Sequence, residues 1–281
     1  MTKVKYIIFI IIVLLNVSCT KKNEIISKIE EKDLELQVFE AYKEGLRSLE
    51  EGDVLFAAKK FNEAEILFPQ SEWAPRSSLM AAYSYYSQEY YIDSIAELKR
   101  FIKIYSKNKN LDYAYYMLGI VYYEQIVDEK KDLKSINNAK NTFKFVIKNF
   151  PNTDYALDAK FKLGMVNNIL ASKEMYVANY YFDKKKWIAA LNRFKIVINK
   201  YETTIYVEEA LHRMVEINYH LGLQSEAKKY ANLLGYNYQS SEWYERSYSI
   251  FNESYEKNKK IKTKKNNIIL RKFKSLFDWD E

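Results

Sequence analysis

The sequence predicts an all-α protein made of repeated helix pairs, and three observations support this. The 281 residues include only 6 glycines and 3 prolines, too few for an all-β protein with many tight turns. Apolar residues recur at helical spacing along successive segments rich in Lys, Glu, Ala and Leu. A motif of small and aromatic residues also recurs at fixed offsets, which indicates an array of similar units.

The motif is clearest in two places. Both copies have offsets of 0, 4, 7 and 12 residues: Ala57, Phe61, Ala64 and Pro69, and then Ala139, Phe143, Val146 and Pro151. The first three offsets lie on one face of a helix, and the proline ends that helix. The pattern resembles the second helix of a tetratricopeptide repeat. That resemblance implies a small residue twelve positions before the first alanine, on the first helix of the pair, and Gly45 occupies this position.

Weaker copies extend the array to a tetratricopeptide-repeat solenoid of about five helix pairs. The second unit keeps the register with a serine at the first offset, the fourth has glutamate where proline is expected, and the fifth is degenerate. Their motif residues are Ser94, Leu98 and Phe101 with Ala82 at the small position; Ala190, Phe194 and Val197 with Ala178, followed by Glu202; and Ala227, Ala231 and Leu234.

Three segments depart from the simple repeat. In the third unit Gly119 lies 20 residues before Ala139, which predicts an eight-residue insertion around residues 126–134. Residues 154–173 predict an extra or lengthened helix before the fourth unit. A final helix, starting after Ser241, is expected to cap the open end of the array. It carries a stripe of aromatic residues at helical spacing: Tyr244, Tyr248, Phe251 and Tyr255.

The first residues of the chain predict export. Two lysines precede an unbroken apolar run at residues 6–15. A run of about ten residues is too short to cross a bilayer, which needs roughly twenty, but it fits a signal-peptide core. Ser18 directly before Cys19 resembles the lipobox of bacterial lipoproteins. The resemblance implies cleavage before Cys19 and a lipid on its thiol, and the alternative is an uncleaved membrane anchor.

This resemblance also implies a cellular location, and the sequence predicts the domain limits. Thr20 follows the cysteine, where Asp retains many Gram-negative lipoproteins in the inner membrane, so the outer membrane is implied. The expected order is a signal peptide at 1–18, a linker at 19–36, the repeat domain at 37–256 and a tail at 257–281.

Charge is uneven along the chain. The net charge is +7, but residues 257–281 hold nine basic and three acidic residues, so residues 19–256 are nearly neutral. A nucleic-acid-binding body would show a basic stripe, so nucleic acid is not an expected partner. The tail combines lysines with Ile269, Phe273 and Leu276. A basic amphipathic segment of this kind binds an anionic membrane surface or a partner, and the alternative is a disordered tail.

Catalytic chemistry is not predicted. Cys19 is the only cysteine, so a lipid there leaves no thiol for catalysis. His212 and His220 are eight residues apart, which on one helix separates them by more than about 10 Å, too far to share a metal. The sequence has no glycine-rich phosphate loop and no hydrolase or zinc-protease motif. We therefore expect no enzyme activity, no cofactor and no metal site.

A peptide-binding groove is the expected working surface. In tetratricopeptide repeats the first helices line a concave face, and tyrosine suits an extended peptide because it offers apolar area and a polar tip. The alternative is that these tyrosines fill the core, since the chain has 26 of them. The register selects five tyrosines for the groove: Tyr42, Tyr83, Tyr86, Tyr116 and Tyr123.

A lipobox followed by about five such repeats resembles the BamD (ComL-like) family, lipoproteins of the outer-membrane β-barrel assembly machine. The resemblance runs from Phe39 to about Phe251. Its most specific parts are the segment from Glu174 to Arg193 and the closing run Ser240-Ser241-Glu242-Trp243-Tyr244.

The resemblance implies a non-catalytic scaffold on the periplasmic face of the outer membrane. Its C-terminal repeats would bind POTRA domains of the barrel-forming subunit, and its N-terminal repeats would receive unfolded outer-membrane proteins. Other lipoproteins of the machine are further partners. Arg193 matches a family arginine associated with the POTRA contact, where a guanidinium forms directional pairs with carboxylates. Lys184 is a second candidate for this contact.

Two other functions stay open. One is a tetratricopeptide lipoprotein that serves cell-wall or division machinery, which would bind wall enzymes or glycan instead of POTRA domains. The other is an enzyme fused to a repeat adaptor. That second alternative requires a further domain, and the 281 residues leave no room for one.

Overall fold

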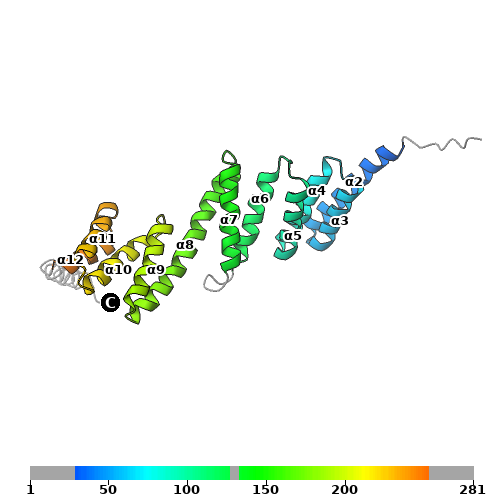
Figure 1. Ribbon diagram of the computed structural model, residues 1–281. Helices are drawn as coiled ribbons and strands as arrows, with labels where there is room; N and C mark the ends of the chain where they lie inside the picture. The colour runs from blue at the N-terminus through cyan, green and yellow to red at the C-terminus, as the bar shows by residue number, and fades with distance from the viewer. Residues whose placement is uncertain (1–28, 127–132, 253–281) are drawn as a thin grey trace, which may run out of the picture. The chain divides into compact units, whose positions relative to one another are not determined.

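A computed structural model describes residues 29–126 and 133–252, so the predicted signal peptide, lipidated Cys19 and residues 257–281 lie outside the described residues. Every regular element in those ranges is an α-helix (Figure 1). The helices are α2 (Ile29–Glu50), α3 (Val54–Leu67), α4 (Trp73–Ser87), α5 (Tyr91–Ile104), α6 (Leu111–Glu124), α7 (Leu133–Asn149), α8 (Asp154–Asp183), α9 (Trp187–Lys200), α10 (Val207–His220), α11 (Gln224–Asn237) and α12 (Glu242–Phe251).

The helices form two compact units, with the boundary inside α4 between Met80 and Ala81. In the first unit α2 packs against α3 around Val38, Ala41 and Ala64. In the second unit successive helices from α5 to α11 pack against one another. The described helices make five consecutive pairs, α2 with α3 through α10 with α11, followed by α12. The predicted all-α repeat fold is therefore confirmed.

The second helices of the pairs keep one register. Helices α3, α5, α9 and α11 each have 14 residues and begin three positions before the small residue of the motif. The large residues at the next motif offset, Phe61, Leu98, Phe143 and Phe194, are completely buried. In α5 the small residue is Ser94, whose buried hydroxyl donates to the carbonyl of Ala82 at 2.9 Å. This hydrogen bond satisfies the hydroxyl and explains why serine replaces alanine there.

Two glycines allow the paired helices to approach closely. A Cβ atom added at Gly45 would lie 2.9 Å from the ring of Phe61. At Gly119 it would lie 2.7 Å from the ring of Phe143. The third unit therefore keeps the same contact as the first despite its longer connection. Helix α7 has 17 residues rather than 14 and begins at Leu133, while residues 127–132 of the predicted insertion lie outside the described residues.

Helix α8 is a single helix of 30 residues. Of the two alternatives for residues 154–173, an extra helix or a lengthened one, the structure therefore shows the lengthened helix. The Thr153 hydroxyl caps its start by accepting from the Ala156 N–H at 3.2 Å. Its sequence contains no proline to end it. It packs against α6 and α7, and from Ala171 onward it joins the core of α9 and α10.

The described array begins with α2 and ends with α12. At the start, α2 begins at Ile29 and overlaps the predicted linker at 19–36, because the Glu, Lys and Leu residues there favour helix. At the far end α12 begins after Ser241, as predicted, and packs against α10 and α11. The ring of Tyr244 lies against Gly235, where an added Cβ would be 2.7 Å away. None of the helices in the described ranges is both long and apolar enough to cross a membrane.

Candidate functional site

Three of the five predicted groove tyrosines come together on the second unit. The rings of Tyr83 and Tyr86, both on α4, have centroids 6.3 Å apart. Tyr116 on α6 stacks at 5.2 Å with Tyr155 on α8, and Tyr155 is 5.5 Å from Tyr113. We call Tyr83, Tyr86, Tyr113, Tyr116 and Tyr155 the tyrosine cluster. Tyr83 is 39% exposed, so the cluster reaches the surface.

Burial and hydrogen bonding raise the pKa values of two members of this cluster, Tyr113 and Tyr116. Burial, with smaller effects from neighbouring tyrosines, raises the pKa of Tyr113 to about 12. Burial also raises the pKa of Tyr116, and its hydroxyl donates to Asp158 Oδ2 at 2.6 Å, which raises it further. Both groups are therefore neutral hydrogen-bond donors at physiological pH. A neutral aromatic surface with polar tips suits contact with a peptide.

The other two predicted groove residues have different surroundings. Tyr123 on α6 donates a weak hydrogen bond to Met165 Sδ at 3.8 Å, and Lys162 lies over its ring at 5.4 Å. Tyr42 belongs to the first unit, where its ring lies 5.2 Å from Phe61 and 5.1 Å from Trp73. Burial raises the pKa of Tyr42. Its ring is thus held by core residues, as in the core-filler alternative.

The sequence did not predict two members of the cluster, Tyr113 and Tyr155, or the neighbouring Asp158. Tyr113 could have been found, because it lies three residues before Tyr116 and so shares its helix face. Tyr155 and Asp158 carry no such signal. They reach Tyr116 only because α8 packs against α6, and the chain gives no hint of that contact.

Arg193, the predicted partner-binding residue, already has a partner within the chain. Its Nη1 lies 3.0 Å from Glu174 Oε2, and this contact joins α9 to α8. The Arg193 side chain is nevertheless 41% exposed, while that of Glu174 is 21% exposed. A guanidinium has five N–H donors, so one contact leaves donors facing solvent. Glu174 therefore orients Arg193 without using its whole binding capacity.

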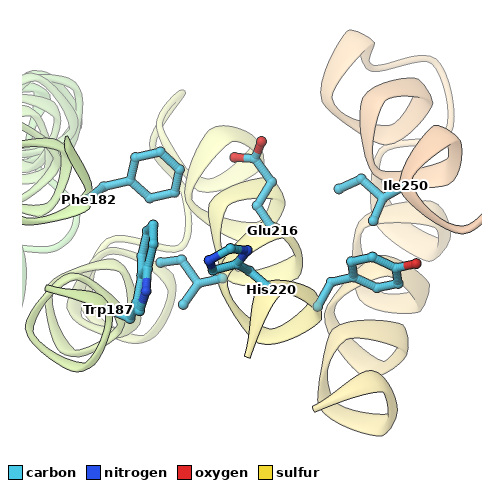
Figure 2. Close-up of a pocket in the computed structure, with 7 residues that line it drawn as sticks. Phe182, Trp187, Glu216, His220 and Ile250 are labelled. Atoms are coloured by element: carbon cyan, nitrogen blue, oxygen red, sulfur yellow. The ribbon is translucent and has the colours of Figure 1, made fainter. Parts of the chain in front are cut away.

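Lys184 lies on the short turn between α8 and α9 and is exposed. Two aromatic residues, Phe182 and Trp187, flank this turn with ring centroids 5.5 Å apart. They form one wall of a cavity of about 290 Å³. Figure 2 shows Phe182 and Trp187 on one side, Glu216 and His220 of α10 in the middle, and Ile250 of α12 on the other. We call this space the α10 cavity.

A charged network lies beside this cavity. Glu216 contacts Arg213 Nη1 at 2.7 Å and His212 Nε2 at 3.5 Å. Burial alone would raise the pKa of Glu216, but hydrogen bonds from His212 and Arg213 outweigh it and lower the pKa. Arg213 also lies over the rings of Phe182 and Trp243, which ties α12 to the array. The negative charge of the Glu216 carboxylate is therefore compensated by side chains of the same helix.

The two histidines have packing partners. The buried His212 Nδ1 is 2.8 Å from the Ser247 hydroxyl, and His220 stacks edge-on with Trp187 at 5.1 Å. Within the described ranges, no group of three or more His, Cys, Asp or Glu side chains is placed to hold a metal ion.

The fold and these surfaces define a helical-repeat binding protein. Residues 35–234 match the YfiO family, described as outer membrane lipoprotein. The chain is 39% identical to outer membrane protein assembly factor BamD of Caulobacter vibrioides over 225 residues, 80% of this chain and 72% of that protein. It is also 39% identical to BamD of Rickettsia prowazekii over 224 residues, 80% and 89% of the two chains. The chain belongs to the YfiO/BamD family, which confirms the resemblance inferred from the sequence.

Proposed function

We propose that this protein is an outer-membrane lipoprotein subunit of the β-barrel assembly machinery. The observation that supports this most strongly is the family match, which runs through the repeats from α2 into α11. Relatives with this array are named outer membrane protein assembly factors. In this function the protein makes or breaks no bond. It holds other proteins beside the outer membrane, and a lipid on Cys19 tethers it to the periplasmic face.

The proposed partners use different parts of the array. POTRA domains of the barrel-forming subunit bind the C-terminal repeats, where Arg193 and Lys184 present positive charge to carboxylates. Unfolded outer-membrane proteins bind the tyrosine cluster in the earlier repeats. Other lipoproteins of the machine bind elsewhere on the same scaffold. The exposure of the Arg193 side chain (41%) and of Tyr83 (39%) supports this division.

The test of the main proposal is direct binding. The mature chain is mixed with the POTRA region of the barrel-assembly protein from the same organism, and association is measured by calorimetry. We expect a saturable complex of defined stoichiometry. A glycan fragment and a cell-wall hydrolase serve as the comparison ligands. Binding to either of these, with none to the POTRA region, would overturn the proposal in favour of a wall or division scaffold.

The tyrosine cluster gives a separate prediction. Replacing Tyr83 and Tyr86 with alanine should weaken binding of an unfolded outer-membrane protein segment by about tenfold or more, since buried aromatic anchors each contribute more than roughly 1 kcal/mol. Fluorescence anisotropy of the labelled segment measures this. Tyr236→Ala is the matched control, because Tyr236 is 85% exposed and lies on α11, away from the cluster. Loss of helical circular dichroism in the double variant would instead assign these tyrosines to the core.

A further inference from the structure

The α10 cavity is an apolar site in the last part of the array with no occupant among the described residues. Its aromatic wall is Phe182 and Trp187, and its opposite side is Ile250 (Figure 2). Aromatic walls of this kind receive a large apolar side chain, which gains free energy by leaving water.

The charged residues near the cavity favour a ligand with negative charge. Glu216 is compensated by Arg213 at 2.7 Å, so it does not attract a further cation strongly. The turn that joins the two aromatic wall residues consists of Asp183 followed by Lys184, Lys185 and Lys186, and all three lysines are exposed. The cavity therefore has a largely apolar lining, and the turn beside its aromatic wall carries three exposed lysines and one exposed aspartate. It fits an acidic segment that also carries aromatic or aliphatic side chains.

The chain itself contains such a segment. Residues 276–281 read Leu-Phe-Asp-Trp-Asp-Glu, which alternates large apolar residues with acids. They contain the only acidic residues of the tail, whose nine basic residues all precede them. No other part of the tail combines this negative charge with tryptophan and phenylalanine.

The connection is long enough for this segment to reach the cavity. Ile250 lines the cavity and lies two residues before Asn252, where the described chain ends. Between Asn252 and Leu276 there are 23 residues, which span up to roughly 80 Å when extended. The end of the described chain is therefore close to the cavity, and a connection of this length would keep residues 276–281 at a high effective concentration near it.

We propose that residues 276–281 dock in the α10 cavity of the same chain. Phe277 and Trp279 enter between Phe182, Trp187 and Ile250, and the acidic side chains face the lysines of the α8–α9 turn. One consequence rests on the proposed function: a docked segment covers Lys184 and competes with a partner that binds there. The docking itself does not depend on that partner.

Distance measurements on the whole mature chain test the proposal. Cys19 is the only cysteine, so Cys19→Ser gives a background for two nitroxide labels, at Ile188→Cys on α9 and at Ser275→Cys beside the segment. Ile188 is 67% exposed, so its label does not disturb the core. Electron–electron resonance should show one short, narrow distance. Lys184→Glu with Lys186→Glu should broaden it, and adding Asp278→Lys with Asp280→Lys should restore it.

Three results would overturn the proposal. The first is a broad distance distribution that the charge reversals do not change, which means that the segment is not docked. The second is a short distance that disappears on dilution with unlabelled protein, which means that the segment enters a second copy. The third is a narrow distance seen only with vesicles containing anionic lipid, which means that the tail is ordered by a membrane. None of these results bears on whether the protein binds POTRA domains, so the two proposals fail separately.

Discussion

Replacing Arg193 with alanine is expected to weaken binding of the POTRA region by roughly 2–5 kcal/mol, the cost of truncating one member of a charge pair that becomes buried and hydrogen-bonded in the interface. Each 1.4 kcal/mol corresponds to about a tenfold change, so the dissociation constant should rise about thirtyfold or more. The reason is that Arg193 is 41% exposed yet held in place by Glu174 at 3.0 Å. A preoriented guanidinium loses little side-chain entropy when a partner carboxylate binds it.

The internal ion pair makes a matched control necessary. Glu174→Gln removes the negative charge but keeps the shape of the side chain and leaves Arg193 present. We expect binding to change only a few-fold in this variant, while both variants keep their helical circular dichroism. Arg193→Glu is a poorer choice because it sets a second carboxylate against Glu174. If Glu174→Gln weakens binding as much as Arg193→Ala, binding depends on the Glu174–Arg193 ion pair. The proposal that Arg193 contacts the partner directly would then be rejected.

The repeat register could be predicted from the sequence because it depends on local spacing. Offsets of 0, 4 and 7 residues place Ala139, Phe143 and Val146 on one helix face, and all three are fully buried. The same reasoning placed the start of α12 after Ser241, whose hydroxyl accepts from the Trp243 N–H at 3.2 Å. Local rules of helix periodicity and capping therefore describe most of the fold.

The site residues depend on contacts that spacing does not encode. Tyr116 was predicted, but Asp158, which accepts its hydrogen bond, lies 42 residues away on α8. Glu174 was recognised as part of the family segment, yet its pairing with Arg193 requires α8 to continue as one helix to Asp183. The α10 cavity combines residues from α8, α9, α10 and α12. Such sites appear only when the packing of non-neighbouring helices is known.

Replacing Phe143 with alanine should lower the free energy of unfolding by about 3–5 kcal/mol. Phe143 is fully buried, and its ring lies against Gly119 of the paired helix α6. Loss of the ring leaves a cavity between α6 and α7, and neighbouring units of a repeat array are stabilised mainly by such interfaces. Urea unfolding followed by circular dichroism measures the change. The control is Phe161→Ala, whose ring is 68% exposed and should contribute less than about 0.5 kcal/mol.

Substitution of Gly119, which faces Phe143, tests whether close packing or helix propensity has the larger effect on stability at this interface. In an isolated helix Gly119→Ala would stabilise by about 1 kcal/mol. Here the added Cβ would lie 2.7 Å from the Phe143 ring, and overpacking of this kind costs about 1–3 kcal/mol. Gly119→Ala should therefore destabilise the protein, and the added cost should shrink when Phe143 is leucine, because the smaller side chain makes room. If Gly119→Ala instead stabilises the protein, α6 and α7 can move apart to accommodate the added Cβ. The loss of unfolding free energy predicted for Phe143→Ala would then be an overestimate.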